Sequence, residues 1–332
     1  MERGTATGQK LSIVEFFEEK GFDDEKINRM LRKCNRLESI ERERASENWD
    51  YLESIGIQKR KLPYVIFKCP KILALSMNQK LVPTVQCLAT LGSKPGGVAS
   101  AITKFPDILS HSIELKLCPL LAFFQALGIS EKQLGKMLLL NPRLISYSEM
   151  KLTQITDFLV SIGFNEEGLI GKTLVKNPFL MGYSIEKRLL PTTEFLKSIG
   201  LDELSLQRVV CYFPEVFCRD VNRVLKPNLA FLKGCGFDNK QIANLVAGYP
   251  PILIKSVSKS LEPKVRFLVE VMGREISEIA DYPEFFRHGM KKSLEFRQKI
   301  LKQKNVHCSL SEMLSCNQRK FIAKYGLTVG FS

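Results

Sequence analysis

The sequence is poor in the residues that build metal and redox sites. It has three histidines, His111, His288 and His307, and none of them stands four residues from another. Nine cysteines are scattered without a CxxC pair, and no two of them have the spacing of a common zinc site. An odd number of scattered cysteines indicates reduced thiols rather than disulfides. We therefore predict no metal site and no cofactor.

Long apolar runs are also missing. The best one, residues 117–129, is interrupted by Pro119 and Gln125 and falls short of the roughly 18 residues that span a bilayer. We therefore predict no integral membrane segment. Acidic residues are in the minority, with 35 Asp and Glu against 49 Lys and Arg, for a net charge of +14. Such an excess favours a polyanionic partner over a neutral metabolite.

Prolines recur at a fixed spacing. A second proline follows most of them 13 residues later, with Ile155 in the one empty slot, and a glycine comes about nine residues after that. Each of the first prolines is followed, two and three positions on, by an apolar pair such as Ile72 and Leu73. A spacing kept over this length indicates a repeat architecture. The first prolines lie 36 residues apart, with a last interval of 33: Pro70, Pro106, Pro142, Pro178, Pro214, Pro250 and Pro283.

Between these prolines the apolar residues have a helical period. Leu206, Val209, Val210 and Phe213 lie at i, i+3, i+4 and i+7, on one face of a helix, and a shorter helix at 191–199 precedes them. Each unit is predicted as helix, glycine turn, helix, proline turn, which buries its apolar faces only by stacking on its neighbours. We predict an all-α protein, a right-handed or half-superhelical α-solenoid of about eight repeats. Its parts are a leader at 1–10, the array at 11–286 and a basic C-terminal cap at 287–332.

The proline turns resemble those of a known family. The segments KFPDIL at 104–109, YFPEVF at 212–217 and GYPPIL at 248–253, and the ending KFIAKYG at 320–326, are similar to the mTERF family of mitochondrial transcription termination factors, and to its plant organellar members most. The resemblance covers about residues 11–326. It implies a nucleic-acid-binding protein of mitochondria or chloroplasts that wraps double-stranded DNA along a basic concave groove. We expect the protein to be non-enzymatic and monomeric. Residues 1–10 are too short and mixed for a clear transit peptide.

A cation stands three or four positions before each second proline or its equivalent. Because all eight slots are filled, we predict a row of phosphate contacts that position nucleic acid without reading its sequence. The alternative is that these side chains are simply solvated. The row consists of Arg44, Lys80, Lys116, Lys151, Lys187 with Arg188, Arg223, Lys259 and Lys292.

The cap adds a second concentration of positive charge. It holds ten Lys and Arg against two Glu, which gives 10 − 2 = +8. A merely polar cap would mix the two signs. We therefore predict that Lys291, Lys292, Arg297 and Lys299 also contact nucleic acid.

Catalysis is not predicted. Residues 168–173 contain Gly-Lys-Thr, but the leading glycine is too close and no strand precedes it, so a repeat helix explains the segment better than a phosphate-binding loop. No Ser/His/Asp or Cys/His group recurs. The leading hypothesis is that the protein clamps duplex DNA and thereby terminates or otherwise regulates transcription. Organellar RNA polymerase would then be an indirect partner. The alternatives are an RNA-binding factor for splicing or tRNA processing, and a protein scaffold.

Overall fold

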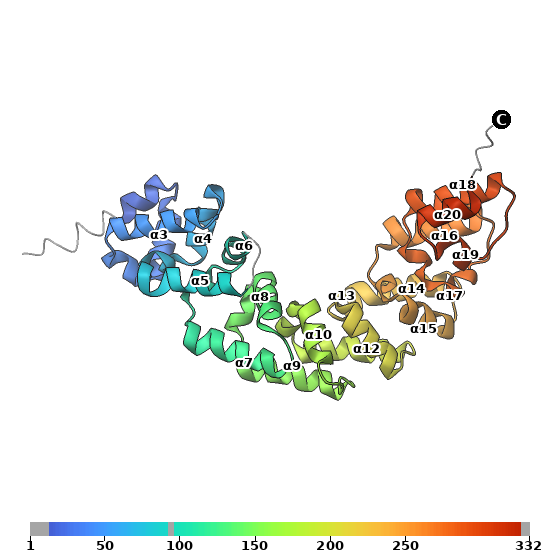
Figure 1. Cartoon of the computed structure of the whole chain (residues 1–332), viewed down its shortest axis with the longest axis horizontal. Coiled ribbons are helices and arrows are strands. Elements are labelled where there is room, and N and C mark those ends of the chain that lie inside the picture. Colours follow the sequence, from blue (N-terminus) through green and yellow to red (C-terminus); the bar gives the residue numbers. More distant parts are fainter. Residues whose placement is uncertain (1–12, 92–95, 327–332) are drawn as a thin grey trace, which may run out of the picture. The chain divides into compact units, whose positions relative to one another are not determined.

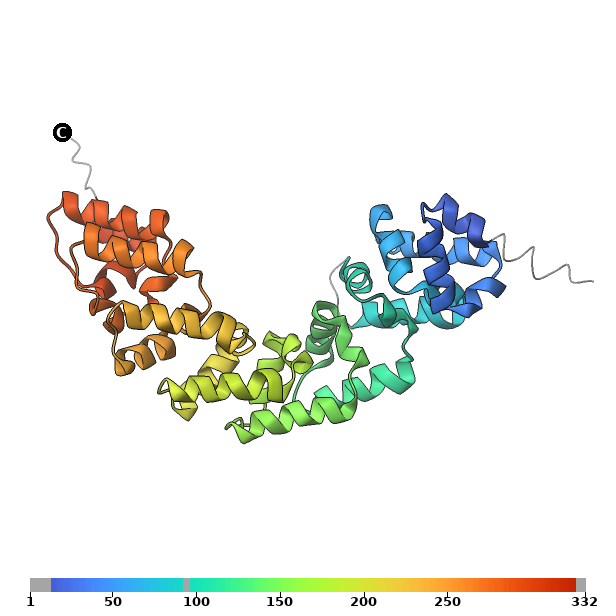
Figure 2. The same cartoon turned by 180° about the vertical axis from the view of Figure 1, so that it is seen from behind.

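A computed structural model describes residues 13–91 and 96–326, which divide into two compact units at Gly182 and Tyr183. The predicted leader at 1–10 lies outside the described residues. Helices make up both units, and no strand occurs in the described ranges. Within each unit, elements that are close in the chain pack against one another (Figures 1 and 2). This confirms the prediction of an all-α helical repeat array.

Each repeat consists of two helices, which we call A and B. The A helix ends at a glycine turn, the B helix follows, and a short turn that begins at a proline leads to the next repeat. In the first unit, residues 13–19 are helical and α2 spans Asp24–Lys33. The A helices there are α3 (Arg42–Ser54), α5 (Val82–Thr90), α7 (Cys118–Ala126) and α9 (Glu149–Ser161). The B helices are α4 (Leu62–Lys68), α6 (Gly97–Lys104), α8 (Glu131–Leu140) and α10 (Leu169–Lys176).

The second unit continues this order. Its A helices are α11 (Leu190–Ser198), α14 (Lys226–Gly234), α16 (Glu262–Arg266) and α18 (Phe296–Gln303). Its B helices are α12 (Glu203–Tyr212), α15 (Asn239–Gly248) and α17 (Glu278–Asp281), and the short α13 (Pro214–Phe217) is a proline turn. The chain then forms α19 (Leu310–Leu314) and α20 (Gln318–Tyr325). The repeat pattern thus runs past residue 286, where the sequence suggested that it stops, as far as α18.

The proline turns and glycine turns form as predicted. The turns are 3₁₀ helices in most repeats, for example η3 (Pro70–Ala74) and η5 (Pro106–Ser110). The apolar pair in each turn is buried, with Ile72 and Leu73 both 0% exposed. Gly56 and Gly200 adopt φ values of +97° and +95°, which other residues rarely reach, and so end their A helices.

The A helices differ from the prediction at their start. They begin about six residues before the second proline, with a π-helical turn such as η9 (Ile185–Leu189) ahead of Pro191. Proline lacks an N–H and its ring clashes with the carbonyl four residues earlier, which a wider turn relieves. In α9, where Ile155 replaces the proline, the α-helix is continuous over 13 residues. At the start of a described A helix, this turn occurs once without a following proline, at η15 (Met290–Glu295).

A column of buried side chains, most of them polar, links several successive repeats. Asn48 donates from Nδ2 to the carbonyls of Ile72, Leu73 and Leu75 at 2.9 to 3.0 Å. These carbonyls lie at the end of the next proline turn, where the Ile72 carbonyl also accepts the N–H of Leu75. The amide therefore satisfies carbonyls whose burial would otherwise be costly. One residue per repeat occupies this position: Asn48, Thr84, Leu120, Thr156, Thr192, Asn228, Lys264 and, after the 33-residue interval, Arg297.

No single described helix is long and apolar enough to cross a membrane. Two successive segments, Ile113–Ala126 and Glu131–Leu140, satisfy the length and hydropathy criteria only together and are bent by 120°.

Candidate nucleic-acid interface

The candidate cations lie in the first turn of the A helices. This turn is fixed by N-cap side chains that accept the backbone N–H three residues on, at 2.9 to 3.3 Å. Sequence reasoning missed these caps, although their 36-residue spacing is visible and Ser and Asp are preferred at such positions. They are Ser76, Ser112, Ser148, Ser184, Asp220 and Ser256.

Relative to the caps, the predicted row occupies two registers. Arg44, Lys80, Lys116 and Arg188 lie at multiples of 36 residues from one another, four residues after the cap position, whereas the other members stand three residues after it. One residue rotates a helical side chain by about 100°, so the two sets point in different directions. The row predicted as one column is therefore a single register only in part of the chain.

In the second unit, four cations share the register three residues after the cap position. Lys187, Arg223, Lys259 and Lys292 are all exposed, and none of them forms an ion pair with a described carboxylate. Their spacing is 36, 36 and 33 residues, one per A helix. Arg188, in the other register, is only partly exposed and binds Asp220 at 2.9 Å. We therefore take the first four as the centre of the candidate interface in this unit.

Arg188 and the cap of the following A helix stabilise each other. The N–H of Arg223 and the Arg188 guanidinium hold the pKa of the Asp220 carboxyl below its usual range. A guanidinium already bound to a carboxylate is less available to a phosphate, because the ion pair must first be broken.

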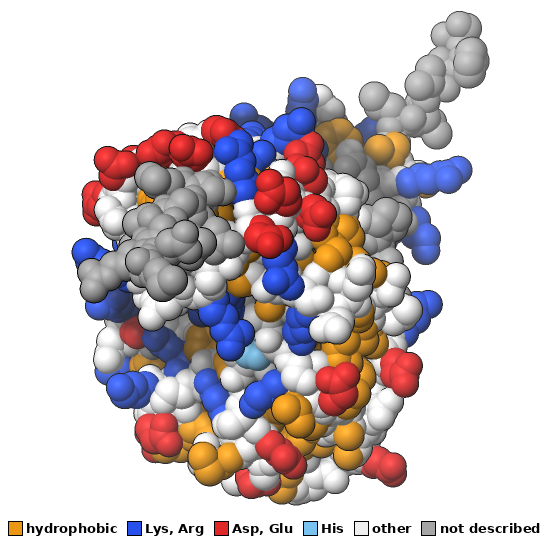
Figure 3. Space-filling view, turned by 90° about the vertical axis from the view of Figure 1, so that its left-hand side faces the viewer, with side chains coloured by type: hydrophobic (Ala, Val, Ile, Leu, Met, Phe, Trp, Pro, Cys, Tyr) orange, Lys and Arg blue, Asp and Glu red, His pale blue; other side chains and the backbone are white. Residues whose placement is uncertain are grey.

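In the first unit the cations have more varied surroundings. Lys80 donates to the His111 carbonyl, and Lys151 lies 3.4 Å from the Gly182 carbonyl and 4.5 Å from the centre of the Tyr147 ring. Arg44 and Lys116 are exposed and carry no ion pair to a described residue. Figure 3 shows Lys and Arg side chains gathered over the middle of the face that it presents, with much of the acidic surface above and below them.

The structure corrects one of the nucleic-acid contacts predicted in the basic C-terminal cap at 287–332. Lys291 and Lys299 are exposed, but Arg297 is only 4% exposed. Its guanidinium donates to the carbonyls of Met313 and Cys316 and lies 4.8 Å from the centre of the Phe321 ring. Arg297 occupies the buried polar column, so its charge holds α18 to the segment around α19 and α20 and does not face a groove. We exclude it from the interface.

Two further cations and several rings lie beside the row. Arg219 and Lys255 directly precede the caps Asp220 and Ser256, and the Lys255 ammonium lies 5.7 Å from the centre of the Tyr249 ring. Sequence reasoning missed both cations, although they recur at the same 36-residue spacing. The equivalent position holds a half-buried ring in four other repeats: His111, Tyr147, Tyr183 and His288.

The two histidines in this position are stacked on the residue before the proline. His111 lies 6.3 Å from Phe105 and His288 lies 6.2 Å from Tyr282, with nearly parallel rings. Burial lowers the pKa of both histidines, so they are neutral near pH 7. They therefore add planar surface rather than charge at this pH.

The described residues contain no group of three or more His, Cys, Asp or Glu that could hold a metal ion. The Gly-Lys-Thr segment lies in the B helix α10, where Gly171 packs against the Leu127 carbonyl and a Cβ atom would come within 2.4 Å of that oxygen. This close approach between helix and backbone explains the glycine without a bound phosphate.

Comparison with known proteins agrees with the repeat pattern. The mTERF family model matches residues 3–162 and 151–322. The chain is 62% identical over 320 residues, 96% of both chains, to "Transcription termination factor MTERF6, chloroplastic/mitochondrial" of Arabidopsis thaliana. It is also 36% identical over 50 residues, 15% of this chain and 9% of the relative, to "Transcription termination factor MTERF4, chloroplastic" of the same plant. With its helical repeats, proline turns and end-to-end match, the chain belongs to the mTERF family.

Proposed function

We propose that this protein is a non-enzymatic organellar factor that binds double-stranded DNA and thereby terminates or otherwise regulates transcription. The observation that carries the proposal is the set Lys187, Arg223, Lys259 and Lys292, four exposed cations without ion pairs in one register. The name of the 62% identical relative supports the transcriptional role and the location in chloroplasts and mitochondria.

The spacing of these cations fits a nucleic-acid backbone. Packed helices lie about 9 Å apart, so three intervals cover about 27 Å, or roughly eight base pairs at about 3.4 Å each. Contacts of this kind fix the position of a duplex and supply affinity without reading its sequence. A monomer held by many such contacts would obstruct the path of RNA polymerase without touching the polymerase itself.

The salt dependence of binding tests this proposal. Each phosphate contact contributes about 0.9 to the slope of log Kobs against log salt concentration on duplex DNA, so replacing the four cations with alanine should reduce the slope by about three to four. The matched control replaces four other exposed cations of the same unit, Lys197, Lys233, Lys240 and Lys304, and removes the same net charge. Equal effects in the two variants would mean that the register has no special role.

RNA is the second candidate ligand. The centre of the half-buried Tyr147 ring lies 4.5 Å from the Lys151 ammonium, and the half-buried ring of Tyr183 lies within electrostatic range of Arg188. Unpaired bases stack on such rings. Competition between duplex DNA, single-stranded RNA and structured RNA of equal length separates the two candidates. Stronger binding of either RNA at the same salt concentration would favour a role in transcript maturation over the DNA clamp.

A further inference from the structure

The A helix of the 33-residue repeat carries a surface unlike those of its neighbours. This helix consists of α16 and the π-helical turn η13 (Phe267–Val271). Val269 and Val271 on it are 46% and 59% exposed. At the position of Val269, the two preceding A helices have the exposed residues Lys197 and Lys233. At this position the outer surface therefore changes from basic to apolar.

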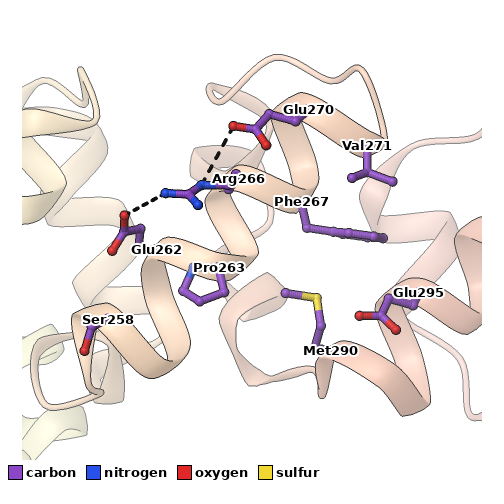
Figure 4. A pocket seen from close by; sticks show the side chains of 9 residues that line it. All are labelled: Ser258, Glu262, Pro263, Arg266, Phe267, Glu270, Val271, Met290 and Glu295. Carbon is purple, nitrogen blue, oxygen red and sulfur yellow. Dashed lines mark hydrogen bonds and ion pairs between the residues drawn. The ribbon is translucent and has the colours of Figure 1, made fainter.

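A cavity opens beside this surface. It has a volume of about 330 Å³ and lies between α16, η13 and η15. Figure 4 shows the Phe267 ring and the Met290 side chain on opposite sides of it, with Val271 at one end. The volume is at the lower limit of ligand pockets, which are about 300 to 1,000 Å³. It therefore suits a few aliphatic side chains better than a cofactor.

Carboxylates surround this apolar wall. Arg266 binds Glu262 at 3.0 Å and Glu270 at 3.8 Å (Figure 4). Glu295, on the other side of the cavity, is exposed and has no ion pair with any described residue. Among the residues that line the cavity, three carboxylates and one guanidinium give a net negative charge, on a chain whose total charge is +14.

This rim is particular to the short repeat. The two preceding A helices lack a carboxylate at the position of Glu262, where they have Leu190 and Lys226, and at the position of Glu270, where they have Ser198 and Gly234. The repeat architecture therefore does not require the glutamates. An acidic rim also repels phosphates, which makes nucleic acid an unsuitable occupant.

We propose that the cavity and the exposed face of η13 form a docking site for an amphipathic helical segment of a partner protein, with lysine or arginine beside its aliphatic side chains. An aliphatic side chain of that segment enters between Phe267 and Met290, as in other complexes where a helix lies in a groove. Its cationic neighbour meets Glu295, which has no partner of its own. The charge complementarity selects a basic segment over an acidic one.

A pair of synthetic peptides tests the proposal on the full chain. One is a helical peptide with leucines at i, i+4 and i+7 flanked by lysines, and the other has glutamates in place of the lysines. The methyl signals of Met290, Val269 and Val271 report binding by NMR. We expect the basic peptide to shift these signals and the acidic peptide to leave them in place. No shift with either peptide, or equal shifts with both, would overturn the proposal.

Substitutions then separate this site from its surroundings. Glu295→Gln should weaken binding of the basic peptide at least fivefold, whereas Glu203→Gln, a change at an exposed position of α12, should leave it unchanged. Val269→Lys, which restores the residue type of the neighbouring repeats, should also weaken it. If Glu295→Gln and Glu203→Gln behave alike, the charge complementarity is refuted. The salt slope of DNA binding is measured in the same variants and should not change, which distinguishes this site from the proposed interface.

Discussion

Replacement of Arg297 with methionine distinguishes a binding role from a structural role for this residue. Methionine keeps much of the side-chain length but removes two hydrogen bonds to the Met313 and Cys316 carbonyls and the contact with the Phe321 ring. Hydrogen bonds from a charged donor are worth about 1.5 to 3 kcal/mol each, and the ring contact about 1 kcal/mol. Relief from burying a charge offsets part of this loss. We expect a net destabilisation of about 3 kcal/mol.

Thermal and urea unfolding followed by circular dichroism measure this effect. A change of about 3 kcal/mol corresponds to a lower Tm by roughly 6 to 12 °C for a cooperative unit of 150 to 250 residues. Lys299→Met is the control, because Lys299 is exposed on the same helix. Below the melting temperature, Arg297→Met should leave the salt slope of DNA binding unchanged. Unchanged stability together with a reduced salt slope would refute the structural role and restore the prediction from the sequence.

Three further substitutions test the packing of the repeats. Asn228→Leu should destabilise the second unit by about 2 kcal/mol in urea unfolding, because the Ile252 and Lys255 carbonyls lose donors at 2.8 Å. Burial lowers the pKa of Lys264 to about 8 from its ordinary 10.5, so between these pH values the folded state binds fewer protons than the unfolded state. The free energy of unfolding therefore rises with pH in this range. Lys264→Met should remove that rise, which is on the order of 2 to 3 kcal/mol, from the pH profile of unfolding. Gly135→Ala should destabilise the first unit by about 2 kcal/mol or more, because the new Cβ would lie 1.9 Å from the carbonyl oxygen of Leu91. In an ordinary helix the same substitution stabilises by about 1 kcal/mol.

The repeat could be predicted from the sequence because its signals are local. Proline fixes φ and removes a donor wherever it stands, and glycine reaches positive φ without strain, so the turns follow from the positions of these residues. The caps such as Ser184 are equally local, since a side chain satisfies the N–H three residues away. Their spacing of 36 residues is visible in the sequence.

The orientation of the cations was harder to predict. The π-helical turns insert extra width ahead of the prolines, so the helical phase at Lys80 or Lys187 does not follow from a period of 3.6 residues. Counting cations either three or four residues before the proline therefore groups exposed side chains together with Arg188, which binds Asp220. The spacing from the caps distinguishes the two registers, but only the positions of the atoms show that Lys187 is exposed and that Arg188 is bound to Asp220.

The sequence by itself determined the length of the repeat, the order of helix and turn, the buried apolar pairs and the positive charge of the A helices. The tertiary structure decided which charges are available. It buried Arg297 against two carbonyls, bound Arg188 to Asp220, and opened an acidic cavity beside Met290. The physical reason is that turns and periods depend on neighbours along the chain, whereas burial and ion pairing depend on which repeat surfaces meet in space.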